Sequence, residues 1–164
     1  MKFSHEAVIS APVDNVDLEE WLFTLSDSEY QAAARGHRAA GTFTENGVRG
    51  TVNVESMGGT LMVQHYHAVS AEPTRVEMLS ERSRAYVMHL IPVHFLVRWT
   101  MTATPRTTDT TTFDCTVEID MPTLVRFAAK LTGAPYFVRK HVHEEAPNFA
   151  ADIERKLRAR VLAK

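Results

Sequence analysis

Polar and apolar residues alternate along the first positions of the chain. If residues 3–9 are extended, one face of the segment carries Phe3, His5, Ala7 and Ile9. Because side chains point to alternate faces of a strand, this pattern predicts a first strand with one buried face. Pro12 and Asp14 follow at once and favour a turn.

Two short helices are predicted directly after this strand. Apolar residues recur at helical spacing between Val16 and Leu25, which indicates a first amphipathic helix. Ser26 and Glu29 then stand three positions apart, as in a capping box, where each side chain binds a free backbone N–H at a helix start. We expect Gly36 to end this second helix in a left-handed conformation.

The centre of the chain is rich in Thr and Val and has the character of β-strands. We expect six strands, at residues 41–45, 48–55, 60–69, 74–81, 93–104 and 110–119. The segments between them favour turns, namely Asn46-Gly47, Gly58-Gly59, Glu72-Pro73, residues 82–92 and residues 105–109. Short connections of this kind predict antiparallel hairpins in sequence order.

Two further helices are predicted at the end of the chain. Pro122 opens the first and Gly133 closes it. Pro135 opens a longer amphipathic helix, which contains Pro147. Because Pro147 cannot donate to the carbonyl of His143, we expect a kink or a break there.

This order of elements predicts one α+β domain over residues 1–164. A curved antiparallel sheet of seven strands would have to bury its apolar face against another apolar surface. The C-terminal helix is the only long amphipathic element that can fill the concave side of the sheet. The fold class is therefore expected to be β-α-α-β6-α, with the sheet wrapped around the long C-terminal helix.

Two segments carry a resemblance to a known superfamily. They are FSHEAVISAPVDNV, an alternating strand that ends in Ala11-Pro12 before a helix, and the amphipathic helix from Pro135. They resemble the helix-grip fold of the START and birch-allergen-like (SRPBCC) superfamily, including its polyketide cyclase/dehydrase and lipid-transfer branches. The resemblance covers nearly all of the chain and implies a hydrophobic cavity between sheet and helix. One fold hosts many activities, so it identifies no reaction.

Period-two alternation predicts which side chains face this cavity. The alternation is clean in residues 93–104 and 110–119, whereas neither face is clean in residues 60–69. A solid core would give the same pattern, but small-molecule sites usually enclose several hundred Å³. The predicted ligand-binding wall consists of Val52, Val54, Leu61, Val63, His65, Val76, Met78, Phe95, Val97, Trp99, Met101, Phe113, Cys115, Val117, Val138, Val142 and Phe149.

Charge and composition narrow the classes of partner. The 18 Lys and Arg residues and 20 Asp and Glu residues give a net charge of −2 without a basic face, so we expect no nucleic-acid partner. The N-terminus lacks the apolar core of a signal peptide, and the apolar stretch 86–97 is too short to span a bilayer, so no integral membrane association is expected. A lone Cys115 agrees with a reducing cytoplasm, the expected location. The oligomeric state leaves no signature in the sequence.

The eight histidines raise the question of a metal. His65 and His67 share one face of a strand, and His141 and Glu145 share one face of a helix. His143 points about 200° away from His141 around the helix axis, so this pair is not a chelate. The sequence has no HExxH motif, no Cys pair and no glycine-rich phosphate loop, so we expect neither a metal nor another cofactor.

Acid–base catalysis is the alternative to simple binding. The resemblance implies a few polar groups in an apolar cavity, where desolvation would shift the pKa of a His or Glu side chain. The candidate catalytic residues are His65, Tyr66, Arg82, His141 and Glu145, and each could instead be structural. The sequence therefore predicts binding of a small hydrophobic molecule, such as a lipid, polyketide-like or aromatic metabolite. The alternatives are a cyclase/dehydrase-type enzyme and an interaction module with a filled core.

Overall fold

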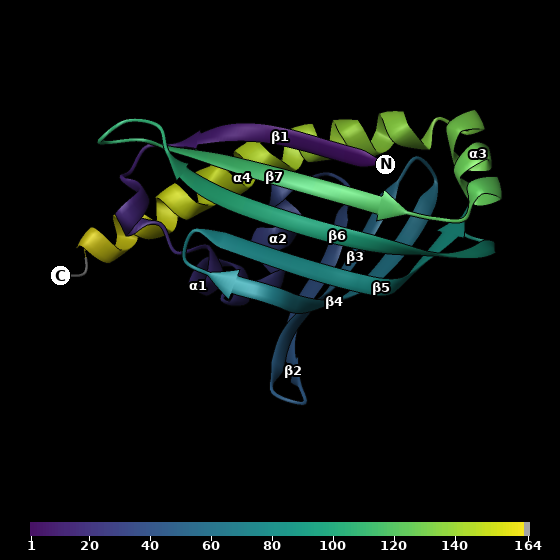
Figure 1. Cartoon of the computed structure of the whole chain (residues 1–164), viewed down its shortest axis with the longest axis horizontal. Helices are drawn as coiled ribbons and strands as arrows, with labels where there is room; N and C mark the ends of the chain where they lie inside the picture. The colour runs from purple at the N-terminus through teal and green to yellow at the C-terminus, as the bar shows by residue number, and fades with distance from the viewer. Residues whose placement is uncertain (163–164) are drawn as a thin grey trace.

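A curved antiparallel sheet wraps around a long helix in the computed structural model, which describes residues 1–162 (Figure 1). The seven strands are hydrogen-bonded in the order β1-β7-β6-β5-β4-β3-β2. The predicted α+β helix-grip architecture is confirmed. The strands are β1 (Lys2–Ile9), β2 (His37–Glu45), β3 (Val48–Met57), β4 (Thr60–Glu72), β5 (Arg75–Val87), β6 (Ile91–Pro105) and β7 (Thr111–Asp120).

The hairpin turns follow from residues that accept a positive φ. Asn46 and Gly47 connect β2 to β3 with φ angles of 51° and 81°, the combination that a two-residue hairpin turn needs. The connection between the strands was predicted at residues 82–92, which is longer than the observed one. β5 continues through Arg82 to Val87 because its pairing with β6 shifts register between Ser80 and Ser83, and the connection is confined to residues 88–90.

Five helical segments accompany the sheet. They are η1 (Val13–Asn15), α1 (Leu18–Phe23), α2 (Asp27–Ala33), α3 (Thr123–Leu131) and α4 (Ala134–Leu162). The predicted capping box is present at the start of α2, where the Ser26 side chain accepts from the backbone N–H of Glu29 and the Glu29 side chain accepts from that of Ser26. The prediction for Gly36 is wrong, because α2 already ends at Ala33 and Gly36 has no positive φ.

The long helix α4 crosses the concave side of the sheet without a break. Val142, Phe149 and Ile153 are buried along its inner face, as expected of the amphipathic helix predicted from Pro135. The predicted break at Pro147 is wrong. Pro147 and His143 are both exposed, so water can bind the His143 carbonyl that lacks its usual helical partner.

Polar contacts fix α4 to the short helices that close one end of the sheet. The indole N–H of Trp21 in α1 donates to the Asp152 carboxylate over 2.9 Å. The Lys156 ammonium donates to the Glu29 carboxylate of α2 over 2.9 Å, and Arg155 binds the same carboxylate. These contacts fix the C-terminal half of α4 to the two short helices.

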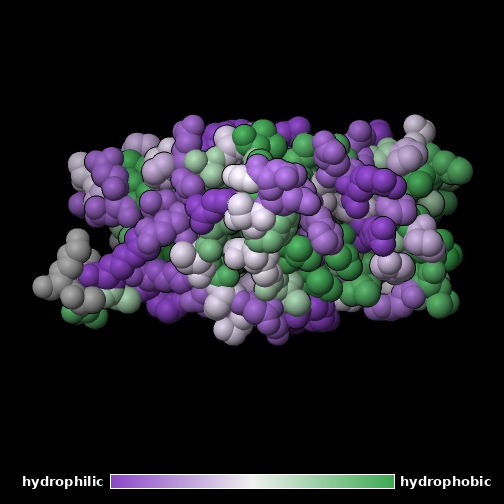
Figure 2. All heavy atoms as spheres, turned by 90° about the horizontal axis from the view of Figure 1, so that it is seen from below, coloured by the Kyte–Doolittle hydropathy of each residue, from purple (hydrophilic) through white to green (hydrophobic). Residues whose placement is uncertain are grey.

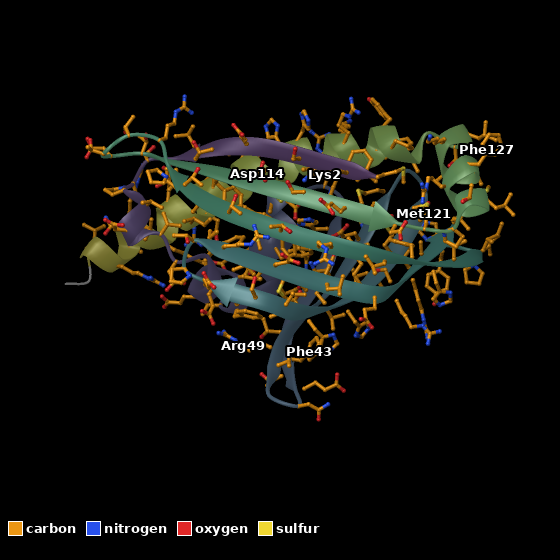
Figure 3. The ribbon with its side chains drawn as sticks, in the orientation of Figure 1. Lys2, Phe43, Arg49, Asp114, Met121 and Phe127 are labelled. Atoms are coloured by element: carbon orange, nitrogen blue, oxygen red, sulfur yellow. The ribbon has the colours of Figure 1, made fainter. Side chains whose placement is uncertain are left out.

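The opposite end of the molecule is apolar on its surface. Phe127 lies there on α3 (Figure 3), and hydrophobic side chains gather at the same end in the space-filling view (Figure 2). The exposed apolar residues of α3 and of the β5–β6 turn are Leu124, Phe127, Leu131, Met88, Leu90 and Ile91. Among the helices of residues 1–162, none has both the length and the apolar character needed to cross a membrane.

Candidate functional site

Strands β3 and β4 turn polar side chains toward α4. Asn53 and Glu55 of β3 are buried, and so are Met62, Gln64 and Tyr66 of β4. The two strands pair so that Asn53 lies beside Gln64 and Glu55 beside Met62. This part of the sheet therefore carries amide and carboxyl groups on its inner face.

The predicted inner face of these two strands is wrong. The residues assigned to it lie on the outer face, and His65 is exposed to solvent. The prediction placed apolar side chains inside, but the inner face here is the polar one. The residues that point away from α4 are Val52, Val54, Leu61, Val63 and His65.

A narrow cleft lies between this inner face and α4. Its free volume is about 30 Å³, enough for about two water molecules, since one needs about 10–15 Å³. The space is far below several hundred Å³ because the long Met and aromatic side chains of the walls fill most of it. The lining residues are Asn53, Glu55, Met57, Met62, Gln64, Tyr66, Phe95, Trp99, Val117, Ile119, Val138, His141, Val142 and Glu145.

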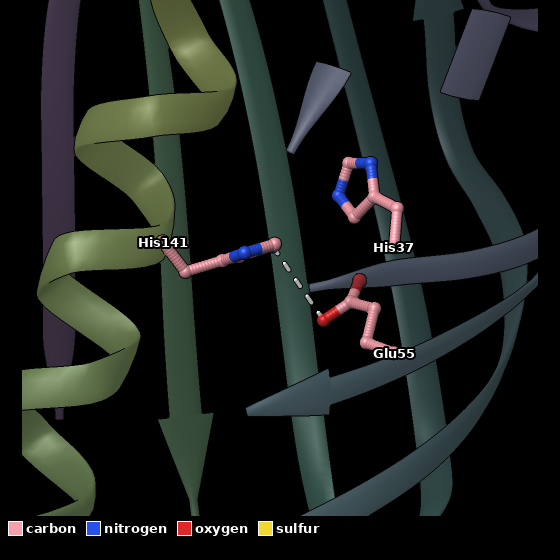
Figure 4. Close-up of side chains that lie close together, drawn as sticks. All are labelled: His37, Glu55 and His141. Carbon is pink, nitrogen blue, oxygen red and sulfur yellow. Dashed lines mark ion pairs between the residues drawn. The ribbon is translucent and has the colours of Figure 1, made fainter. Parts of the chain in front are cut away.

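A cluster of four buried ionisable side chains lies at the cleft, and Figure 4 draws three of them, His37, Glu55 and His141. His37 comes from β2, Glu55 from β3, and His141 and Glu145 from α4. None of the four side chains is more than 9% exposed. Segments distant in the sequence thus bring two imidazoles and two carboxyl groups into one low-dielectric region.

Tyr30 of α2 orients two members of this cluster. Its backbone carbonyl lies 2.5 Å from Nδ1 of His37, and because a carbonyl only accepts, Nδ1 carries the hydrogen. The Tyr30 hydroxyl donates to Oε1 of Glu55 over 2.7 Å. In the neutral ring of His37, Nε2 is therefore left with a free lone pair, and the second oxygen of Glu55 stays free.

The free atoms of the cluster face one another at distances longer than hydrogen bonds. Nε2 of His37 lies 3.7 Å from Oε1 of Glu145. Nε2 of His141 lies 3.7 Å from Oε2 of Glu55 and 3.9 Å from Oε2 of Glu145. Neither Nε2 atom has a hydrogen-bond partner among the described residues. Buried polar atoms are rarely left without a partner, so these two nitrogen atoms are an exception within the described residues.

Burial sets the protonation of the cluster. It lowers the pKa of His37 and of His141 to about 4, so both imidazoles are neutral near pH 7. Burial raises the pKa of the Glu55 carboxyl, against the opposing effects of His37 and the Tyr30 hydroxyl. For Glu145, burial and the nearby Glu55 carboxylate both raise the pKa well above its ordinary value. The site therefore holds neutral bases beside carboxyl groups that resist ionisation.

Three of the five candidate catalytic residues line the cleft. They are Tyr66, His141 and Glu145. His65 and Arg82 are exposed on the strands and do not reach it. Whether any of the three takes part in catalysis stays a prediction.

The predicted ligand wall divides in a similar way. Phe95, Trp99, Val117, Val138 and Val142 line the cleft. The other inward-facing members are buried in the packed core and not among the lining residues, so their contact with a ligand stays a prediction. These are Val76, Met78, Val97, Met101, Phe113, Cys115 and Phe149.

Sequence reasoning missed His37, Asn53, Glu55 and Gln64. His37 starts a strand whose beginning was placed at residue 41, so its face was not considered. Asn53 and Glu55 share one face of β3 with Thr51, and the prediction turned the other face, with Val52 and Val54, inward. Three polar residues at period two in the middle of a sheet are the signal that could have indicated a polar site.

A second, wider groove between α2 and α4 is less suited to a ligand. Its free volume is about 490 Å³, but it is open to solvent and bordered by charged groups such as Glu29, Asp152 and Arg155. These charges already pair with one another. The cleft under the sheet is therefore the better candidate site.

Several solved structures share the whole fold of this chain. The Zhui aromatase/cyclase from a Streptomyces species superposes with a TM-score of 0.66 at 12% identity, covering 98% of this chain and 97% of that one. A START superfamily protein from Mycobacterium smegmatis gives a TM-score of 0.55 at 13% identity, over 96% and 97% of the two chains. At such low identity the likeness establishes a START-like helix-grip fold.

One similar structure contains the fold as part of a longer chain. The di-domain aromatase/cyclase BexL gives a TM-score of 0.56 at 13% identity, covering 94% of this chain and 49% of that protein. No known family profile matches the sequence. No curated protein matches it either.

Proposed function

We propose that this chain binds a small hydrophobic molecule that carries a polar group, in the cleft between the sheet and α4. The observation that carries the proposal is the two-sided lining of the cleft. Met57, Met62, Phe95 and Trp99 offer an apolar wall, and the buried His and Glu cluster offers polar partners. A mainly apolar pocket with a few fixed polar groups is the usual form of a small-molecule site. Similar folds occur in the aromatase/cyclases, which supports this assignment.

Binding requires the cleft to widen beyond its present 30 Å³. Met57 is partly exposed and lines the cleft together with Met62, and unbranched Met side chains change rotamer at low cost. Val138 is also partly exposed at the start of α4. Displacement of these three side chains would admit a ligand without moving the sheet.

The fluorescence of Trp99 tests this proposal. Trp99 lines the cleft, whereas the second tryptophan, Trp21, lies outside it against Phe149. In a Trp21→Phe background, titration with a medium-chain fatty acid or an aromatic ketone should change the remaining emission saturably. Mass spectrometry of the protein under native conditions should also detect a co-purifying apolar compound.

A matched pair of variants locates the binding. Val138→Phe should fill the cleft and abolish the emission change, while Val63→Phe on the outer face of β4 should leave it intact. The proposal fails if no apolar compound changes the Trp99 emission and none co-purifies. It also fails if both variants bind equally well.

A cyclase-type enzyme is the second candidate, favoured by the position of His141 and Glu145. Both side chains face the cleft, and a neutral imidazole beside a protonated carboxyl can accept one proton and donate another. Glu145→Gln should then keep ligand affinity and lose turnover of an aromatising poly-ketone substrate. The exposed His65→Ala should keep both, and equal turnover in the two variants would exclude acid–base chemistry by Glu145.

A further inference from the structure

We propose that His37, Glu55 and His141 bind a divalent transition-metal ion, with Glu145 beside the remaining coordination position. One donor atom from each of the three residues lies within 4.8 Å of the other two. The three side chains converge from β2, β3 and α4 (Figure 4). The proposed function uses the same cluster for the polar group of its ligand, but ion binding does not require that ligand.

The spacing of the donor atoms is close to that of a metal site. With metal–ligand bonds of about 2.0–2.1 Å, adjacent donors of a tetrahedral site stand about 3.3 Å apart. The observed distances between imidazole nitrogens and carboxylate oxygens are 3.7 Å to Glu55 and 3.7 Å and 3.9 Å to Glu145. The donor atoms of the three proposed ligands lie within 4.8 Å of one another, so they would move closer together to bind one ion.

Tyr30 provides the second layer of contacts that metal ligands usually have. A ligating His almost always donates its other ring N–H to a carbonyl or carboxylate, and ligating carboxylates are themselves hydrogen-bonded. Nδ1–H of His37 donates to the Tyr30 carbonyl, and the Tyr30 hydroxyl donates to Oε1 of Glu55. One residue therefore directs Nε2 of His37 and Oε2 of Glu55 toward the same point.

The unpartnered atoms are the second, independent observation. Nε2 of His37 and Nε2 of His141 are buried and make no hydrogen bond within the described residues. Two carboxyl groups lie in the same buried region, and a bound dication would balance their charge. A metal ion bound by the three ligands would give both Nε2 atoms a partner and would lie beside Glu145.

The donor set indicates the class of ion. Two imidazoles with carboxylate oxygen and no thiolate suit Zn²⁺, Fe²⁺, Mn²⁺ or Co²⁺. The sulfur of Cys115 accepts a hydrogen bond from the Trp99 indole N–H and is not part of the cluster. Three protein ligands leave an open position, as in metal sites that bind water or a substrate.

Calorimetry and cobalt absorption test the proposal. Untagged protein treated with a chelator should bind one Zn²⁺ or Co²⁺ per chain stoichiometrically at micromolar concentration. The bound Co²⁺ should show the intense visible bands of a four- or five-coordinate site. Zn²⁺ should also raise the unfolding temperature, because only the folded chain brings the ligands together.

Variants separate this site from adventitious surface binding. Glu55→Gln and His141→Asn should abolish binding, and Tyr30→Phe should weaken it about 10–100-fold through the lost second-layer contact. His143→Asn, two positions along α4 and exposed, should bind like the unaltered chain. Circular dichroism shows whether each variant is folded. If a variant is unfolded, the cobalt spectrum of the unaltered chain tests the metal site in its place.

Two results would overturn the metal site. One is less than one bound ion per chain in the folded protein, and the other is binding that survives both ligand substitutions. The fatty-acid titration of Trp99 is repeated on chelator-treated protein. A fluorescence response there with no metal binding would refute this inference alone.

Discussion

Gly36 lies directly against the imidazole of His141. A Cβ atom at position 36 would stand 3.0 Å from Nδ1 and 3.2 Å from Cε1 of that ring. Glycine is therefore required here because there is no room for a Cβ atom, and not because of the backbone conformation, which is not left-handed. The bare backbone between α2 and β2 lets a histidine of α4 reach into the cluster beside His37.

Gly36→Ala should displace His141 and weaken metal binding, with a loss of about 1–2 kcal/mol of folding free energy from overpacking. Calorimetric titration and urea unfolding measure the two effects. Gly41→Ala is the matched control, because a Cβ there meets nothing within 4 Å. If both substitutions leave the metal affinity unchanged, the close approach of Gly36 does not position His141.

Tyr30→Phe should destabilise the fold by about 1–3 kcal/mol, because it leaves Oε1 of the buried Glu55 without its hydrogen bond. Urea unfolding at neutral pH measures the change. Tyr66→Phe is the comparison, since the Tyr66 hydroxyl makes no hydrogen bond within the described residues although its ring is equally buried. Equal losses in the two variants would mean that the Tyr30 hydroxyl has no special role.

The Glu29 carboxylate should make stability depend on acid pH. Burial opposes its ionisation, but the Ser26 backbone N–H and the side chains of Lys156, Ser26 and Arg155 outweigh it and lower the pKa from 4.5 to about 2. Because the folded-state pKa is the lower one, the stabilisation is complete above pH 4.5 and is lost as the pH falls toward 2.

Glu29→Gln should therefore cost about 1 kcal/mol at pH 7, a value limited by solvent screening of this partly exposed carboxylate. The difference from the unaltered chain should shrink below pH 4.5 and vanish near pH 2 in urea titrations. Glu81→Gln is the control, an exposed carboxylate without an ion pair in residues 1–162. A difference that stays constant with pH would refute the assignment.

Local sequence patterns predicted correctly those elements whose pattern of polar and apolar residues matches their surroundings in the fold. The capping box of Ser26 and Glu29 forms as expected because it needs only neighbours three residues apart. Phe95 and Trp99 of β6 face inward as their alternation indicated, since that part of the interior is apolar. The order of the strands followed from short connections, which leave antiparallel neighbours as the simplest pairing.

The candidate site could not be predicted by the same rules. Glu55 points inward because Tyr30 and His37, from an earlier helix and strand, surround it there. Alternation alone assigns such a carboxylate to solvent and turns its apolar neighbours Val52 and Val54 inward. The role of Gly36 could not be predicted for the same reason. A side chain at this position would collide with His141, which lies over a hundred positions later in the chain.

Adjacent residues of β4 offer a direct test of which face is inside. Met62 is 7% exposed and lies beside Glu55 on the neighbouring strand, whereas Val63 is half-buried on the outer face. Met62→Asp would place a third carboxyl group in the region of Glu55 and Glu145, where burial already disfavours the charged form.

The expected cost of Met62→Asp is about 3 kcal/mol or more, the usual consequence of an unpaired buried charge. Val63→Asp carries the same new side chain into a position with access to water, so only a strand-propensity cost of up to about 1 kcal/mol is expected. Urea unfolding at pH 7 compares the two variants. A larger loss for Val63→Asp would mean that the apolar face of β4, and not its polar face, lies against α4.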